Sequence, residues 1–269
     1  MKDNKKHKKA EYGILITGLI ILLAATFVTA LCAGQYSVSV PEVTKILASR
    51  FVNVTKTWSN TAEGVVFTLR LPRIIGAVLV GSALSLSGAA YQGVFKNPLV
   101  APDLLGVSSG ACVGASVAIL LHLNSFGVQA MAFVAGILAV GLTLFIPRLI
   151  KNTNMTMLVL SGIIVKGIMD SVMGIIKYVA DPETELQSIT YWQLGSLTKV
   201  LPKDLFTVGP VIVAASVIIF LLRWRINILS LGDREAKTLG VSVTVVRNFI
   251  IICATLLTAS AVCISGTIG

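Results

Sequence analysis

Two charged residues lie inside an otherwise apolar stretch of the sequence. Lys166 and Asp170 fall within residues 155–179 and are four positions apart, so on a helix they would share one face and could form an ion pair. A charge at bilayer depth costs several kcal/mol unless it is paired or faces a cavity. Two interpretations stay open: a self-neutralising intramembrane pair that fills a contact between helices, or a polar lining of a translocation path.

The other residue types that could do chemistry show no catalytic or metal-binding pattern. The four cysteines lie in or beside apolar stretches and lack the spacing of metal ligands. They are Cys32, Cys112, Cys253 and Cys263. The histidines, His7 and His122, are isolated, and there is no G-x-x-x-x-G-K-[ST] loop to cradle nucleotide phosphates. We therefore expect a non-catalytic protein without a cofactor or metal. Since the chain has no phosphate-cradling loop, any ATP hydrolysis that its function needs must come from another polypeptide.

Small residues recur at every fourth position in two stripes. The first is Ala77, Gly81, Ser85, Ala89 and Gly93, and the second is Gly106, Gly110, Gly114 and Ala118. Four-residue spacing puts each stripe on one face of a helix, where missing side chains let neighbouring backbones approach closely. Between the stripes lies a polar turn, residues 96–103, that contains two prolines. The pattern predicts helix-packing surfaces in a tightly packed bundle.

The composition places these residues in a membrane. The chain is 55% hydrophobic and 13% charged, with a mean hydropathy of +0.88, whereas soluble domains are about 25% charged. A spanning helix needs about 20 apolar residues, and seven stretches qualify: 13–33, 74–92, 104–121, 126–146, 155–179, 205–222 and 246–264. The fold class expected is an all-α polytopic transmembrane bundle. The net charge of +10 then fits basic residues at cytoplasmic helix ends better than nucleic-acid binding.

The loops give an orientation. With the N-terminus inside, more lysines and arginines fall in inner loops than in outer ones, which predicts a cytoplasmic N-terminus. The first apolar run is too long for a signal peptide, so we expect an uncleaved first span. Two outer loops are long: residues 34–69, with a short amphipathic surface helix after Pro41, and residues 180–204, where Tyr191 and Trp192 fit an interfacial aromatic belt.

The inner loop, residues 225–247, carries signals of a short helix. Asp233 lies near its start and Gly240 near its end. We expect Leu231, Ala236 and Leu239 to face one way, with Asp233, Arg234 and Lys237 more solvated. Periodicity alone leaves two interpretations open: a solvated connector, or a helix that docks on a soluble cytoplasmic partner.

Three motifs resemble FecCD-type permeases, the membrane subunits of ATP-driven importers of iron–siderophore complexes, haem and cobalamin. They are RLPR at residues 70–73, G-A-A-x-Q-x-x-x-x-N-P-L-x-x-P-x-x-L-G-V at 88–107, and L-S-L-G-D-x-x-A-x-x-L-G-V at 229–241. The resemblance implies a bacterial cytoplasmic-membrane protein of about ten helices that pairs with a second permease subunit. It also implies a cytoplasmic ABC ATPase dimer and an extracytoplasmic substrate-binding protein as partners.

The resemblance also assigns roles by position. The ATPase-coupling residues would be Leu231, Gly232, Asp233, Ala236, Leu239, Gly240 and Val241. Arg70 and Arg73 would dock the binding protein, with membrane-anchoring arginines as the alternative. No role is implied for Lys166 and Asp170.

The function expected is inward transport of an iron–siderophore complex by a single permease domain, residues 1–269, with haem or cobalamin as alternative cargo. Family members continue with about three more helices after the position of Gly269, so we expect the sequence to be incomplete at its C-terminus. An inactive truncated fragment and an ion-gradient-driven secondary transporter using Lys166 and Asp170 are the remaining alternatives.

Overall fold

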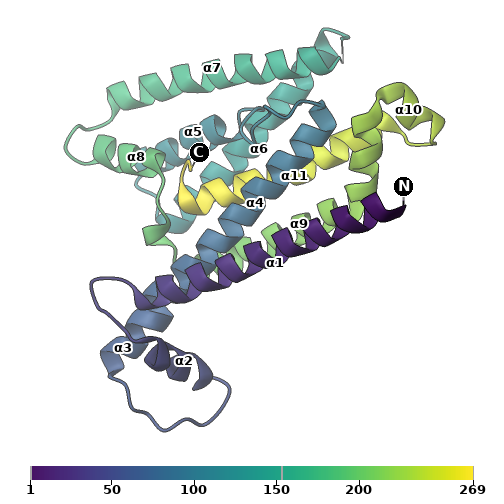
Figure 1. Ribbon diagram of the computed structural model, residues 1–269. Coiled ribbons are helices and arrows are strands. Elements are labelled where there is room, and N and C mark those ends of the chain that lie inside the picture. The colour runs from purple at the N-terminus through teal and green to yellow at the C-terminus, as the bar shows by residue number, and fades with distance from the viewer. Residues whose placement is uncertain (1, 153, 269) are drawn as a thin grey trace. The chain divides into compact units, whose positions relative to one another are not determined.

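The structure is a computed structural model that describes residues 2–152 and 154–268, with side chains from residue 11 onward (Figure 1). The lysine-rich start and Gly269 therefore lie outside the described side chains. Contacts divide the chain into two compact units, Met1–Ile75 and Gly76–Gly269, where the sequence predicts one domain. Every regular element in the described residues is helical, and six helices there are long and apolar enough to cross a membrane. The predicted all-α polytopic bundle is confirmed.

The first unit contains a long apolar helix and a small helical cap. Its elements are α1 (Lys2–Cys32), α2 (Val40–Ala48), α3 (Asn60–Gly64) and the π-helical turn η1 (Val65–Arg70). Pro41 lies in the first turn of α2, where its missing N–H costs nothing. Val43 and Ile46 are buried against Leu31 and Trp58. This is the surface helix predicted in loop 34–69.

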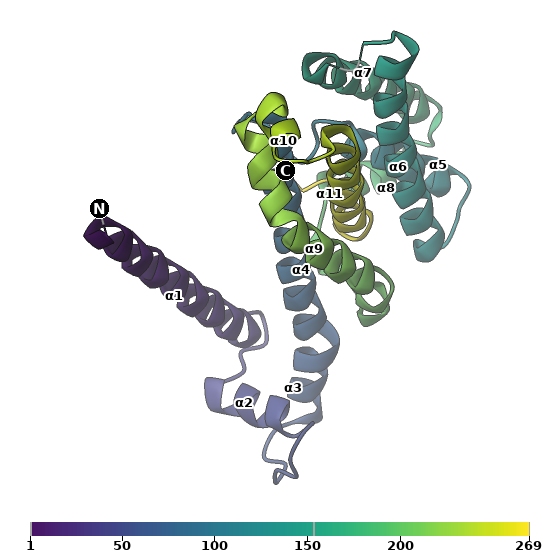
Figure 2. The same ribbon diagram turned by 90° about the vertical axis from the view of Figure 1, so that its right-hand side faces the viewer.

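The second unit contains the remaining helices. They are α4 (Leu71–Phe95), α5 (Val107–Leu120), α6 (Ser125–Leu149), α7 (Met155–Val179), α8 (Glu185–Leu194), α9 (Pro202–Leu231), α10 (Asp233–Thr238) and α11 (Val243–Ser265), with the 3₁₀ turn η2 (Leu197–Lys199) between α8 and α9. Figure 2 shows α11 between α9 and α6. Most of α11 is buried, so it forms the centre of this unit.

The predicted spans match the helices except at α5. The stretch 104–121 gives a helix of 14 residues, short of the length needed to span a bilayer alone. The helix starts late because Gly106 adopts φ +80°, a left-handed conformation that interrupts it. The Asp103 carboxylate then accepts the N–H of Ser108 (2.9 Å), which satisfies a free amide of the first turn.

The long loop 180–204 contains helix α8, which the sequence analysis does not predict. The Asp181 carboxylate accepts the backbone N–H groups of Glu183 and Thr184 and the Thr184 hydroxyl, which nucleates the turn before the helix. Tyr191 is exposed and Trp192 half-buried on α8. Tyr191 can therefore join an aromatic belt, whereas Trp192 packs against the buried core.

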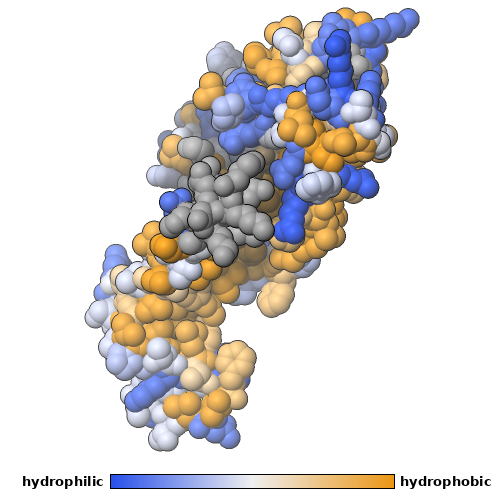
Figure 3. Space-filling model, turned by 45° about the vertical axis from the view of Figure 1, so that its right-hand side comes forward, coloured by the Kyte–Doolittle hydropathy of each residue, from blue (hydrophilic) through white to orange (hydrophobic). Residues whose placement is uncertain are grey.

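Apolar side chains reach the surface along the long helices. Val213, Val217, Phe220 and Leu221 of α9 are each more than half exposed, and Figure 3 shows hydrophobic residues over much of the surface in view. Soluble proteins rarely expose contiguous apolar patches of this kind. Such faces suit contact with lipid or with another membrane subunit.

Candidate functional site

The loop between α9 and α11 forms the short helix that its sequence predicts. Helix α9 ends at Leu231, and Gly232 turns the chain at φ +152°. Helix α10 then runs over Asp233–Thr238 and closes at Gly240, which adopts φ +76°. The Gly240 N–H bonds to the Lys237 carbonyl and the Val241 N–H to the Ala236 carbonyl, both at 3.0 Å. This is a Schellman motif, which satisfies the last carbonyls of the helix.

The buried and exposed side chains of this loop are not those that the sequence predicts. Ala236 is fully buried, whereas Leu231 and Leu239 are 68% and 60% exposed. The prediction that these three face one way is wrong because Leu231 belongs to the end of α9 and Leu239 to the turn after α10. The two leucines therefore flank α10 as exposed apolar side chains.

Asp233 is held in an ion-pair network, while its side chain stays 47% exposed. Its Oδ1 accepts a hydrogen bond from Lys96 Nζ at 2.9 Å, and Arg247 Nη2 donates to both carboxylate oxygens at 2.8 Å. The Arg247 guanidinium, with a smaller contribution from Lys96, holds the pKa of Asp233 below its usual range. Arg234 and Lys237 are exposed, as predicted.

Arg70 caps the end of helix α1. From η1 its guanidinium donates to the carbonyls of Leu31 (2.6 Å) and Cys32 (3.2 Å) and to that of Tyr36. The last carbonyls of a helix have no partner within the helix, and a cation there also meets the negative end of the helix dipole. Arg73, three residues on, is half-buried and makes no side-chain hydrogen bond or ion pair among the described residues. No signal in the sequence separates these two arginines.

Lys166 pairs with Asp103, on the turn before α5, rather than with Asp170. The Lys166 Nζ lies 3.3 Å from Asp103 Oδ2. The i, i+4 geometry allows the predicted pair, but the turn before α5 brings a second carboxylate within reach. Lys166 and Asp170 are both exposed near the middle of α7.

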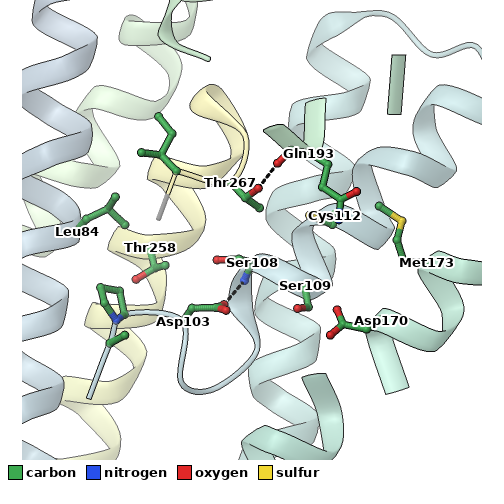
Figure 4. A pocket seen from close by; sticks show the side chains of 13 residues that line it. Leu84, Asp103, Ser108, Ser109, Cys112, Asp170, Met173, Gln193, Thr258 and Thr267 are labelled. Carbon is green, nitrogen blue, oxygen red and sulfur yellow. Dashed lines mark hydrogen bonds between the residues drawn. The ribbon is translucent and has the colours of Figure 1, made fainter. Parts of the chain in front are cut away.

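Asp170 also borders a cavity of about 430 Å³. Its lining combines a mainly apolar surface with hydroxyl, amide and carboxylate groups; the polar residues are Asp103, Ser108, Ser109, Asp170, Gln193, Thr258 and Thr267. In Figure 4 the Asp170 carboxylate of α7 lies across from Ser109 of α5. The cavity is thus bordered by α5, α7 and α11 and by the turn that carries Asp103.

The two small-residue stripes have different surroundings. A Cβ added at Gly110 would meet the Ala135 carbonyl oxygen at 2.8 Å, and one at Gly114 would meet the Ala135 Cβ at 2.5 Å, so α5 and α6 touch along the second stripe. Gly106 lies against α7. In the first stripe Gly93 contacts Ile226 of α9. Its other predicted packing residues are exposed: Gly81, Ser85 and Ala89.

Sequence reasoning missed several contacts inside the bundle. Gly162 of α7 is packed against the Leu104 carbonyl. Tyr91 of α4 shares a buried hydrogen bond with Thr255 of α11 at 3.0 Å. The Thr258 hydroxyl donates to that of Ser87 at 3.1 Å. Only three-dimensional packing brings these residues together, since more than 150 positions separate the partners of each hydrogen bond.

Comparison with known proteins identifies the family. Residues 21–269 match the FecCD transport family. The "Molybdate import system permease protein MolB" of Haemophilus influenzae is 36% identical over 259 residues, covering 96% of this chain and 76% of that protein. The "Probable iron chelatin transport system permease protein" of Helicobacter pylori strain 26695 is 39% identical over 205 residues, covering 76% of this chain and 62% of that protein.

A solved structure agrees with these sequence matches. It is described as an inward-facing conformation of a metal-chelate type ABC transporter and matches with a TM-score of 0.83 at 33% identity, covering 96% of this chain and 78% of that one. Together with the six helices in the described residues that are long and apolar enough to cross a membrane, these relatives indicate a multi-pass protein of the bacterial inner membrane. The chain belongs to the FecCD family of ABC transporter permeases, which work with an ATPase and a binding protein.

Proposed function

We propose that this chain is the permease subunit of an importer that moves an iron chelate into the cell, driven by a cytoplasmic ABC ATPase dimer and supplied by an extracytoplasmic binding protein. The observation that carries the proposal is α10, a short helix held by two ion pairs between two exposed leucines, in a FecCD permease. An exposed apolar pair beside a rigid helix suits docking in a groove of a soluble partner.

The coupling segment divides into contact residues and supporting residues. Leu231 and Leu239 enter the ATPase, where burying a leucine contributes about 1.5–3 kcal/mol. The supporting residues form α10 and the turns at its two ends, and so hold the two leucines in position; they are Gly232, Asp233, Ala236, Gly240 and Val241. ATP binding in the partner then biases the permease between two states of different opening.

The outer face docks the binding protein. With the N-terminus and α10 in the cytoplasm, Arg70 and Arg73 follow the outer loop 34–69. Arg73 has no partner among the described residues, so it meets an acidic group of the binding protein directly. Arg70 shapes the same surface by fixing the end of α1.

The exposed face of α7 faces a water-filled path or the second permease subunit. Lys166 and Asp170 are exposed near the middle of this span, and charged groups at that depth do not face lipid. In the first small-residue stripe, Gly81, Ser85 and Ala89 leave a second face of small residues open to another subunit. We assign Lys166 and Asp170 to the path, with the double variant Lys166→Met/Asp170→Leu as its test: normal transport would exclude the assignment.

The cargo proposed is an iron chelate. Two Helicobacter pylori relatives named for iron chelatin transport are 39% and 38% identical. Molybdate is the second candidate because the Haemophilus influenzae relative carries that name. Lys166 offsets Asp103, which leaves the Asp170 carboxylate at the cavity; this carboxylate disfavours molybdate and other anions and favours a neutral or cationic chelate. Relatives named for hemin and for cobalamin make those chelates further cargo to test.

The test is uptake into proteoliposomes that contain the importer purified from its native membrane, with ATP inside and binding protein outside. Radioactive iron–siderophore, hemin, cobalamin and molybdate are compared at equal concentration. We expect vanadate-sensitive accumulation of the iron chelate. Accumulation of molybdate instead would overturn the cargo, and uptake that needs only a proton gradient would overturn the ATP-driven mechanism.

A further inference from the structure

We infer that Asp233 is a positioning residue that links the coupling helix α10 to α4 and α11, so that movement imposed on α10 by the ATPase is carried to these two membrane helices. The inference rests on the proposed function. It assigns Asp233 to the inner side of α10, facing the permease rather than the ATPase. Three features of the structure support it.

The first feature is that one carboxylate contacts groups from two other elements. Lys96 belongs to the turn directly after α4, and Arg247 to the second turn of α11. The Arg247 side chain is only 15% exposed, and its Nε is buried without a hydrogen-bond partner among the described residues. Asp233 is therefore the group that compensates this buried guanidinium, and its removal would leave a poorly solvated charge.

The second feature is the backbone at Lys96. This residue follows the last residue of α4 with φ +54°, and the Asn97 N–H bonds to the Gln92 carbonyl. It thus occupies the left-handed position of a Schellman motif, where glycine is usual and another residue costs about 1 kcal/mol. This backbone hydrogen bond holds the turn against the helix. Displacement of the Lys96 side chain therefore also displaces the C-terminal end of α4.

The third feature is that α4 and α11 are joined deeper in the bundle. The Tyr91–Thr255 and Ser87–Thr258 hydrogen bonds tie the two helices together. Thr258 also lines the cavity that Asp170 borders. Helix α9 packs against both α10 and α11, so it belongs to the same moving group. Movement of α10 therefore displaces α4 and α11 as a pair and can change the cavity between the membrane helices.

The test compares two variants in the complete importer with its ATPase and binding protein. Asp233→Asn keeps the size of the side chain and removes its charge. Lys96→Gly breaks one arm of the link while it relieves the left-handed backbone, so the two effects should roughly cancel and this variant should be about as stable as the wild type. For both we expect an assembled complex, and a fall in substrate transported per ATP hydrolysed of about tenfold.

Three comparisons separate a link from a general structural role. Asp233→Glu should restore part of the ratio. The double variant Asp233→Asn/Lys96→Gly should lose no more than Asp233→Asn alone, since both changes break one connection. Glu183→Gln, the same carboxylate-to-amide change on the exposed loop before α8, should behave as the wild type.

Two results would count against the inference, and a third concerns the proposed function alone. An unchanged transport-to-ATP ratio in Lys96→Gly would overturn the link, even if Asp233→Asn failed to assemble. Transport and ATP hydrolysis that fall in proportion, with less assembled complex, would reduce Asp233 to a structural residue. If no ATPase subunit co-purified with the wild-type chain, the proposed function itself would be wrong.

Discussion

The contact between α5 and α6 allows a prediction whose sign can be worked out from distances. A Cβ placed on Gly114 would meet the Met131 carbonyl and would lie 2.5 Å from the Ala135 Cβ. Carbon atoms prefer separations of about 3.5–4.0 Å, so in Gly114→Ala the two helices must move apart by about 1 Å.

The cost of this movement exceeds the gain in helix propensity. Overpacking of a tight interior costs about 1–3 kcal/mol. The cost at Gly114 should lie near the upper end of this range, because the Met131 carbonyl is a backbone group and cannot rotate away. Alanine gains about 1 kcal/mol over glycine inside a helix. The net effect of Gly114→Ala is a loss of about 2 kcal/mol, which corresponds to a fall in melting temperature of about 4–8 °C.

The control is Gly141→Ala, the same change on an exposed face of α6. An added Cβ there meets no other atom within 4 Å, so only the gain in helix propensity remains and the melting temperature should stay or rise. Both variants are measured by thermal unfolding of the purified importer, with intrinsic fluorescence as the signal. Two shifts of the same sign, or a stabilised Gly114→Ala, would refute the close packing of α5 on α6.

Three further predictions concern the α10 segment and the arginines Arg70 and Arg73. The pKa of Asp233 is lowered in the folded state, so its stabilising contribution is present above the usual carboxyl range and is lost only as pH falls through the lowered value. The hydrogen-exchange protection factors of α10, corrected for the intrinsic pH dependence of exchange, should therefore be constant between about pH 5 and pH 8. A protection that declines within that window would contradict the ion-pair network. Gly232→Ala must adopt φ +152° and meets the Glu235 carboxylate, so it should cost about 1–3 kcal/mol and weaken co-purification of the ATPase; unchanged recovery would show that the turn can relax. Arg70→Ala should speed proteolysis in loop 34–39 and, because Arg70 only shapes the docking surface, should lower binding-protein affinity less than Arg73→Glu, which should leave proteolysis unchanged; the reverse pattern would exchange the two roles.

Much of the architecture follows from the sequence because the bilayer leaves few choices. Backbone polar groups in hydrocarbon must bond within their own segment, so a long apolar run in an all-α chain becomes a helix. The ends of α10 were also predictable, since Asp233 and Gly240 are ordinary signals of a helix start and stop. The late start of α5 was not, because it depends on the conformation of Gly106 and on the Asp103 carboxylate.

The partners of the charged residues could not be predicted from spacing. Lys166 has a carboxylate four positions away, yet the fold supplies Asp103, which is 63 positions away. Asp233 pairs with Lys96, which is 137 positions away in the sequence. Periodicity describes one helix at a time, whereas these pairs depend on how separate helices pack.

The central claim is that an ATPase drives this permease through α10, and site-directed cross-linking tests it most directly. Leu239→Cys places a thiol beside α10, and Leu194→Cys places one on α8 at a position that is even more exposed, 71% against 60%. Cys112, Cys253 and Cys263 are buried and Cys32 is half-buried, so the new thiol is the most accessible one. In native membranes treated with a short bifunctional cross-linker, the account predicts an adduct of Leu239→Cys with the ATPase and none of Leu194→Cys. No adduct at position 239, or one at position 194, would contradict it.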